Sequence, residues 1–148
     1  MKKSAWVLSL CASLTAFAAV ADSHQPVEIL NFSQNDTYPF SSAARVGNLL
    51  FMSGQLGVVP GQNGLVPGGI EAETRQVMAN IKRTTEASGF QMNNIVKCTA
   101  FLADMAEFAA FNAQYRTAFS KPFPARSTVA VKGLALDARV EVECIAAR

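Results

Sequence analysis

Two runs near the carboxyl end of the chain alternate between apolar and polar residues. In residues 126–132, small and apolar side chains share one face: Ser127, Val129 and Val131. The other face of this run is more polar: Arg126, Thr128, Ala130 and Lys132. In residues 140–144, an apolar face alternates with two carboxylates: Val140, Val142 and Cys144 against Glu141 and Glu143. A period of two residues predicts β-strands, so we expect each run to turn its apolar face to a core and its charged face away from it.

Further strands are predicted earlier in the chain, at residues 27–32, 43–46, 49–53 and 95–102. Gly47 and Asn48 separate the second and third of these, and both residues tolerate positive φ, so they predict a two-residue hairpin turn. In the fourth strand, alternate residues form an apolar face: Val96, Cys98, Ala100 and Leu102. The glycines and prolines of residues 54–69 predict a long loop.

Two segments have the spacing of amphipathic helices. In residues 71–88 a stripe recurs at three- and four-residue steps, and Gly89 follows as a stop: Thr74, Val77, Met78, Ile81, Thr84, Thr85 and Ser88. The second helix is expected to start with a capping box formed by Asp104 and Glu107. Its stripe consists of Phe108, Phe111, Asn112, Tyr115 and Phe119, and the prolines of residues 121–124 end it.

The predicted order β-β-β-α-β-α-β-β indicates an α+β domain, with two helices packed on one face of a mixed sheet. The other face would carry Thr99, Phe101 and Ala130. A partly apolar face on a small domain predicts burial against another chain.

Residues 1–21 have the features of a secretory signal peptide. Lys2 and Lys3 precede an uncharged, largely apolar run, and residues 19–21 provide the small-x-small site for cleavage before Asp22. A transmembrane anchor is the alternative, but the run is short and no stop-transfer charges follow it. A lipoprotein is disfavoured because Cys11 lies too early and lacks a small residue before it. We therefore expect a mature domain of residues 22–148 that is periplasmic or secreted and does not bind a membrane after cleavage.

The charge of the mature chain is balanced. Loss of Lys2 and Lys3 reduces the 13 basic residues to 11, against 11 acidic ones. A neutral chain without a basic run has no electrostatic footprint for nucleic acid, so we expect no nucleic-acid partner.

The cysteines and the histidine do not predict a metal site. Cys98 and Cys144 of the mature chain both lie on apolar strand faces, which favours two packed free thiols. A disulfide remains the alternative, because exported proteins commonly contain them. The single histidine, His24, has no neighbours with ligand spacing, and we expect neither a metal nor another cofactor.

Four motifs resemble the RidA/YjgF family, the reactive-intermediate (enamine/imine) deaminases. They are Ser53-Gly54-Gln55, residues 94–97 (NIVK), residues 108–115 (FAAFNAQY), and the closing strands with PARS at 124–127 and VEVE at 140–143. They occur in the family's order from about residue 27 onward. The resemblance implies a chorismate-mutase-like α+β fold and a homotrimer with ligand clefts between subunits.

The resemblance also implies roles for particular residues in the hydrolysis of 2-imino or enamino acids to 2-keto acids and ammonia. Arg126 matches the arginine that anchors the substrate carboxylate, and arginine suits this role because it grips a carboxylate with two parallel hydrogen bonds. Glu141 matches the glutamate that would activate water. Ser53 and Asn112 match residues that line the cleft. Without the family, Arg126 and Glu143 on a solvated strand face could simply form a surface pair, with Ser53 a turn residue and Asn112 a polar helix residue.

Two positions depart from the classical deaminases. Phe40 stands where they have a tyrosine, and Thr128 stands where they have a cysteine. Both positions are still expected to contact the ligand. The departures, and the export of an enzyme whose known substrates arise in the cytoplasm, raise a second hypothesis: a non-catalytic trimer that binds small carboxylates, or a holdase-like protein of the same fold.

Overall fold

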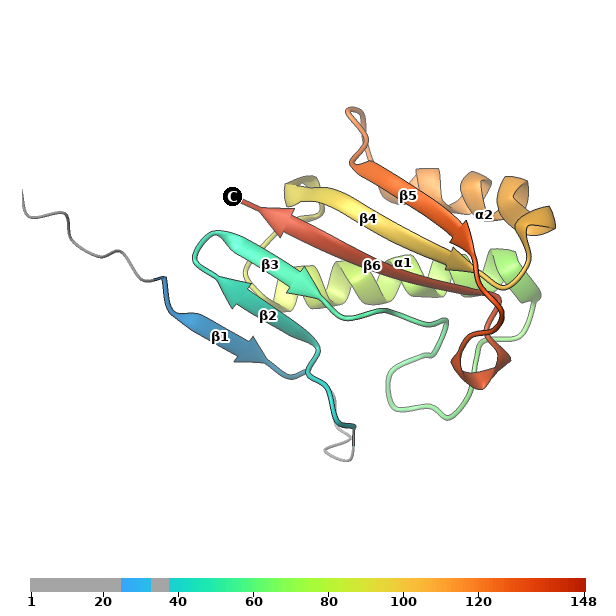
Figure 1. The fold of residues 1–148 in the computed structure, drawn as a ribbon, viewed down its shortest axis with the longest axis horizontal. Helices are drawn as coiled ribbons and strands as arrows, with labels where there is room; N and C mark the ends of the chain where they lie inside the picture. Colours follow the sequence, from blue (N-terminus) through green and yellow to red (C-terminus); the bar gives the residue numbers. More distant parts are fainter. Residues whose placement is uncertain (1–24, 33–37) are drawn as a thin grey trace, which may run out of the picture.

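The computed structural model describes residues 25–32 and 38–148 as one mixed sheet with two helices on one side. The predicted signal peptide and His24 lie outside the described residues. The elements are β1 (Val27–Leu30), β2 (Ala43–Val46), β3 (Leu49–Met52), α1 (Gly69–Ala87), β4 (Ile95–Leu102), α2 (Phe108–Tyr115), β5 (Ala125–Ala130) and β6 (Val140–Ala147). Their order along the chain and the α+β class are as predicted (Figure 1).

The six strands are arranged in the order β1-β2-β3-β6-β4-β5. Only β4 and β5 pair in parallel, because α2 connects them as a crossover. The predicted hairpin joins β2 to β3, and Gly47 adopts a φ of 56° in its turn. β1 ends at Leu30, two residues earlier than expected.

Helix α1 buries the predicted stripe against the sheet. Val77 and Ile81 are fully buried, and Gly89 ends the helix with a φ of 78°. The threonines in this stripe keep their hydroxyls satisfied inside the core: Thr74 donates to the carbonyl of Ile70 (2.6 Å) and Thr85 to that of Ile81 (2.7 Å). Among the described residues, no helix is both long and apolar enough to span a membrane.

The capping box predicted before α2 forms only in part. The Asp104 carboxylate accepts the backbone N–H of Ala106 at 2.8 Å in a short 3₁₀ turn. The Glu107 side chain does not bond back to this turn. Instead, both carboxylate oxygens of Glu107 accept hydrogen bonds of 2.7 Å from Nε of Arg139. Arg139 directly precedes β6, and this segment brings its guanidinium to Glu107.

Strand β4 corrects one prediction about its faces. Cys98, Ala100 and Leu102 are buried toward the helices as expected, but Val96 is 47% exposed and Ile95 is buried in its place. The pairing of β4 with β6 is irregular between Ile95 and Lys97, and such a bulge shifts side chains to the opposite face.

Strand β5 is oriented opposite to the prediction. In the parallel pair of β4 and β5, Arg126 lies opposite Cys98 and Thr128 lies opposite Ala100. Cys98 and Ala100 face the helices, so Arg126 and Thr128 face them too. Ser127 and Val129 face the open side, and Val129 is 43% exposed. The physical reason is that β5 is an edge strand and that aromatic side chains of α2 accommodate the Arg126 guanidinium. Ala130 also lies on the helix side, opposite Leu102, and not on the open face.

The expectation of two free thiols is wrong, because Cys98 and Cys144 form a disulfide. They lie directly opposite each other on the antiparallel strands β4 and β6, with Cα atoms 4.1 Å apart. This register depends on strands 46 residues apart in sequence, which the alternation pattern alone does not specify.

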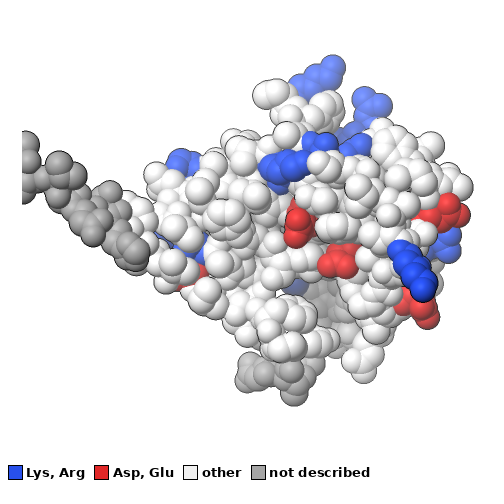
Figure 2. Space-filling view, viewed as in Figure 1, with Lys and Arg blue, Asp and Glu red and all other residues white. Residues whose placement is uncertain are grey.

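The open face of the sheet is partly apolar. Its exposed large side chains come from three strands, β1, β3 and β5: Val27, Ile29, Leu49, Phe51 and Val129. Figure 2 shows this face as mostly uncharged, with acidic side chains near its middle. Thr99 and Phe101 lie on this face, as predicted, opposite Glu143 and Glu141.

Candidate active site

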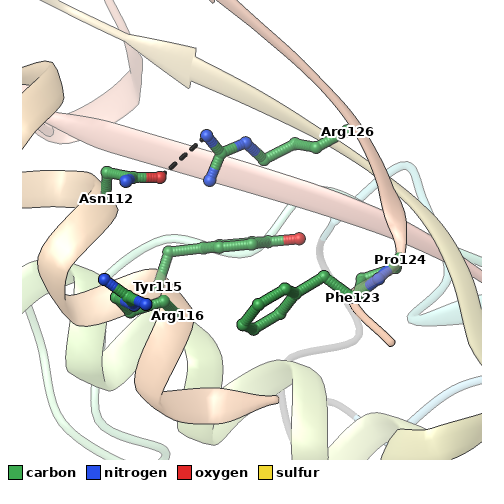
Figure 3. Close-up of a pocket in the computed structure, with 6 residues that line it drawn as sticks. All are labelled: Asn112, Tyr115, Arg116, Phe123, Pro124 and Arg126. Atoms are coloured by element: carbon green, nitrogen blue, oxygen red, sulfur yellow. Dashed lines mark hydrogen bonds between the residues drawn. The ribbon is translucent and has the colours of Figure 1, made fainter. Parts of the chain in front are cut away.

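A cavity of about 440 Å³ lies between α2 and the start of β5. We call it the arginine pocket, and six residues line it (Figure 3): Asn112, Tyr115, Arg116, Phe123, Pro124 and Arg126. Two of them, Asn112 and Arg126, were predicted as site residues. Tyr115 was placed only on the helix stripe, although its spacing of three residues from Asn112 already put both on one face.

Arg126 is held in this pocket by polar and aromatic contacts. Its Nη2 donates to Oδ1 of Asn112 at 2.9 Å. Its Cζ lies 4.5 Å from the ring centroid of Tyr115 and 5.2 Å from that of Phe111, distances typical of cation–π contacts. Within the described part of the chain, Arg126 forms no ion pair, so the predicted alternative of a surface pair with Glu143 is wrong. Most of its donors are therefore free for an anion.

Two hydroxyls on the helix side have no hydrogen-bond partner among the described residues: that of Tyr115, which is only 4% exposed, and Oγ1 of Thr128. Burial raises the pKa of Tyr115 to about 12, and the nearby charge of Arg126 opposes this shift. The phenol is therefore a neutral donor at physiological pH.

Glu141 lies in a separate place, which we call the glutamate site: Ser53, Gly54, Gln55 and Glu141. Gln55 pairs with Val142 through two backbone hydrogen bonds of 2.9 and 3.1 Å, which holds the chain after β3 against β6. A Cβ on Gly54 would overlap the Glu141 carboxylate, so the carboxylate can occupy its present position only because residue 54 is glycine. Burial, and secondarily the charge of Glu143, raise the pKa of Glu141, a direction suited to a proton acceptor.

Ser53 directly precedes Gly54 in the glutamate site, and its hydroxyl has a structural partner. It donates to the carbonyl of Ser41 at 2.6 Å, and the Ser53 N–H donates to the carbonyl of Ser42 at 3.1 Å. These bonds position Phe40, which is 59% exposed and stacks on Tyr38 with ring centroids 5.1 Å apart. Phe40 therefore presents an aromatic surface outward from this part of the molecule.

Arg126 and Glu141 do not meet within one chain. Arg126 is paired with Cys98, which lies on the helix side, whereas Glu141 is paired with Phe101 on the open side. Successive residues of a strand point to opposite faces, so the two charged groups project to opposite sides of the sheet. In residues 25–32 and 38–148, no group of three potential metal ligands gathers at either place.

Comparisons with known proteins agree with these motifs. A family model described as Endoribonuclease L-PSP matches residues 33–148. The chain belongs to this family, the RidA/YjgF family. It is 43% identical over 73% of its length to the chloroplastic Reactive Intermediate Deaminase A of Arabidopsis thaliana, of which the match covers 58%.

Other members of the family are similar over most of their length. A 2-iminobutanoate/2-iminopropanoate deaminase of Dermatophagoides farinae is 43% identical over 72% of this chain and 84% of its own. The structure of E. coli TdcF with bound serine superimposes with a TM-score of 0.75 at 31% identity, covering 82% of this chain and 98% of that one.

Proposed function

We propose that this chain is a hydrolytic deaminase that converts 2-imino and enamino acids to 2-keto acids and ammonia. The observation that carries the proposal is an arginine held by aromatic rings in an open pocket, with no acidic partner among the described residues. Relatives named as 2-iminobutanoate/2-iminopropanoate deaminases support it. The bound serine of E. coli TdcF also supports a small ligand with a carboxylate.

Arg126 anchors the substrate carboxylate through two parallel hydrogen bonds. Asn112 already occupies Nη2 and fixes the plane of the guanidinium, which leaves its remaining N–H groups for the ligand. Tyr115 and Phe123 line the space beside it and shield the bound ligand from bulk solvent. Thr128 lies two residues further along the same face, and its buried hydroxyl has no hydrogen-bond partner among the described residues.

Glu141 activates the water. It accepts a proton as the water oxygen bonds to the imine carbon, and it returns that proton to the nitrogen. This gives a carbinolamine. Its hydroxyl proton then passes to the nitrogen by way of Glu141, the carbon–nitrogen bond breaks, and the carbonyl forms as ammonia leaves, so one water is consumed for each ammonia released. Proton transfer by a placed carboxylate typically contributes about 10²–10⁴-fold.

The complete site requires a second copy of the chain. Arg126 and Glu141 project to opposite sides of one sheet, so a neighbouring copy has to bring its Glu141 and Phe40 to the arginine pocket. The exposed apolar residues of the open face support an assembly that buries them, and we propose a homotrimer. Light scattering of the mature protein tests this, and a stable monomer at micromolar concentration would contradict it.

The enzyme is proposed to act outside the cytoplasm after loss of residues 1–21. The Cys98–Cys144 disulfide supports this location, because disulfides persist mainly in oxidising compartments. N-terminal sequencing of protein from the periplasmic fraction is expected to begin at Asp22, and its intact mass should correspond to an oxidised cysteine pair. A cytoplasmic chain that retains Met1 would contradict the proposal.

The activity is tested by imine hydrolysis on the mature protein, with imino acids generated in situ by an amino-acid oxidase. Arg126→Ala should weaken binding and hydrolysis together by at least about tenfold, because a charge-assisted contact is lost before and during the reaction. Glu141→Gln keeps the shape of the side chain but cannot accept a proton. It should lower turnover by about 10² or more while leaving the binding of a keto acid nearly unchanged.

The same assay separates catalysis from binding. Phe40 and Thr128, which differ from the classical deaminases, favour a non-catalytic carboxylate-binding trimer as the second candidate. No hydrolysis above background, together with Arg126-dependent binding of a keto acid, would support that candidate. Hydrolysis by Glu141→Gln at the wild-type rate would exclude Glu141 as the proton acceptor.

A further inference from the structure

The arginine pocket contains a second guanidinium that the carboxylate anchor does not explain. Arg116 follows α2 in a short 3₁₀ turn, Arg116–Ala118, and lines the same cavity as Arg126. Figure 3 shows Arg126 above the Tyr115 ring and Arg116 to the lower left, near the end of the Tyr115 side chain that joins α2. The cavity is therefore bordered by cations from two separate elements, the end of α2 and the start of β5.

No acidic side chain of the described residues pairs with either of these two cations, a property that they share with Arg83 and Arg148 but not with three other arginines. Arg45 pairs with Glu28, Arg75 with Glu71, and Arg139 with Glu107. Neither Arg116 nor Arg126 forms an ion pair in residues 25–32 and 38–148, and the pocket lining includes no aspartate or glutamate. The lining that one chain contributes thus has two guanidinium groups and no carboxylate, which is complementary to a ligand with two negative charges even when a neighbouring copy adds one Glu141.

We propose that the preferred substrates are 2-imino acids with a second carboxylate on the side chain, as formed by oxidation of aspartate or glutamate. Arg126 holds the carboxylate next to the imine carbon, and Arg116 holds the distal one. Phe123 and Pro124 border the intervening methylene groups. This inference rests on the proposed function, since hydrolysis at the imine carbon is unchanged and the distal carboxylate contributes only to recognition.

The volume of the pocket is compatible with this substrate class. A cavity of about 440 Å³ is within the range of small-molecule sites and leaves room beyond a three-carbon imine. The class of reaction that must supply the substrate is the oxidation of an acidic amino acid to its imine. Hydrolysis then releases a dicarboxylic keto acid and ammonia.

The test compares two substrate classes in wild type and Arg116→Gln. Imines are generated in situ from aspartate and glutamate, and from alanine and 2-aminobutyrate as monocarboxylic references. Arg116→Gln is expected to lower kcat/KM for the dicarboxylic imines about three- to tenfold at low ionic strength and to leave the monocarboxylic values within about twofold. Arg83→Gln is the matched control, because it removes an exposed guanidinium from α1 outside the pocket lining.

A binding measurement keeps this inference separate from the catalytic one. Calorimetry with 2-oxoglutarate and 2-oxobutanoate should show tighter binding of the dicarboxylate to wild type, an advantage that falls with added salt and is lost in Arg116→Gln. If no imine is hydrolysed but this advantage is present, the deaminase proposal fails and the dicarboxylate inference stands. Equal affinity for the two keto acids, or an equal loss of both in Arg116→Gln, would overturn the inference.

Discussion

The arginine pocket and the glutamate site hold their charged groups in different ways. Arg126 is fixed by attraction, from the Asn112 amide and from the ring faces of α2. Glu141 is fixed by shape, because Gly54 leaves room for its carboxylate and the backbone bonds of Gln55 hold that segment in place. The first arrangement retains a fully charged anchor, whereas the second partly desolvates a carboxylate and raises its pKa.

The two arrangements suit two different chemical roles, that of a carboxylate anchor for Arg126 and that of a proton acceptor for Glu141. A carboxylate anchor must present an ionised group with free donors, whereas a proton acceptor is more effective when its pKa lies closer to the working pH. The arginine pocket provides the ionised group with free donors, and the glutamate site provides the carboxylate with a raised pKa. Because they face opposite sides of the sheet, catalysis in this proposal depends on assembly, and binding of a carboxylate depends mainly on the arginine pocket.

The largest expected effect comes from combining two inactive variants. Arg126→Ala and Glu141→Gln should each be nearly inactive alone, but co-expression should restore about one quarter of wild-type activity. In a random trimer, a site needs an intact Arg126 from one copy and an intact Glu141 from its neighbour, each with an even chance. Activity of the co-purified mixture measures this, and mixing the two proteins after separate purification is the control. No recovery would place both groups in one chain's site.

Gly54→Ala tests the shape of the glutamate site. The added methyl group would overlap the Glu141 carboxylate and displace it, so turnover should fall at least about tenfold with keto-acid binding retained. Gly133→Ala is the matched control, since no atom lies within 4 Å of its added Cβ. Equal kcat values for Gly54→Ala and wild type would show that the position of Glu141 does not limit catalysis.

Reverting the two departures from the classical deaminases is expected to increase kcat/KM by a smaller factor. Phe40→Tyr adds a hydroxyl to an exposed ring that faces outward, and Thr128→Cys restores the second classical residue. If the departures only weaken an existing enzyme, the double variant should raise kcat/KM about two- to tenfold, the range of one neutral hydrogen bond. An unchanged kcat/KM in the double variant argues against this interpretation.

The smallest expected effect concerns pH. Glu141 must be ionised to accept a proton, and burial and then Glu143 raise its pKa, so activity should decline as the pH falls through that raised value. Glu143→Gln removes the charge contribution and should shift the acid limb of kcat/KM to lower pH. Because the pKa is raised in the folded state, ionised Glu141 costs stability at neutral pH, and this cost is relieved as the pH falls. An acid limb that does not move in Glu143→Gln would contradict this assignment.

Local patterns in the sequence were sufficient for most of the fold. The alternation of β6, the helical stripe of α1 and the turn at Gly47 depend on near neighbours, so their types and approximate bounds could be predicted. The motifs around Ser53, Arg126 and Glu141 likewise indicated the family and the residues most suited to its chemistry.

Only the tertiary structure decided which face each side chain occupies and which distant residues meet. A bulge in β4 moved Val96 to the open face, and the parallel register with β4 turned Arg126 toward α2. The antiparallel register of β4 and β6 brought Cys98 to Cys144, and the loop after β3 brought Gly54 to Glu141. Register and layer order are set by packing between segments far apart in sequence, so a pattern within one segment specifies two faces without specifying which face is buried.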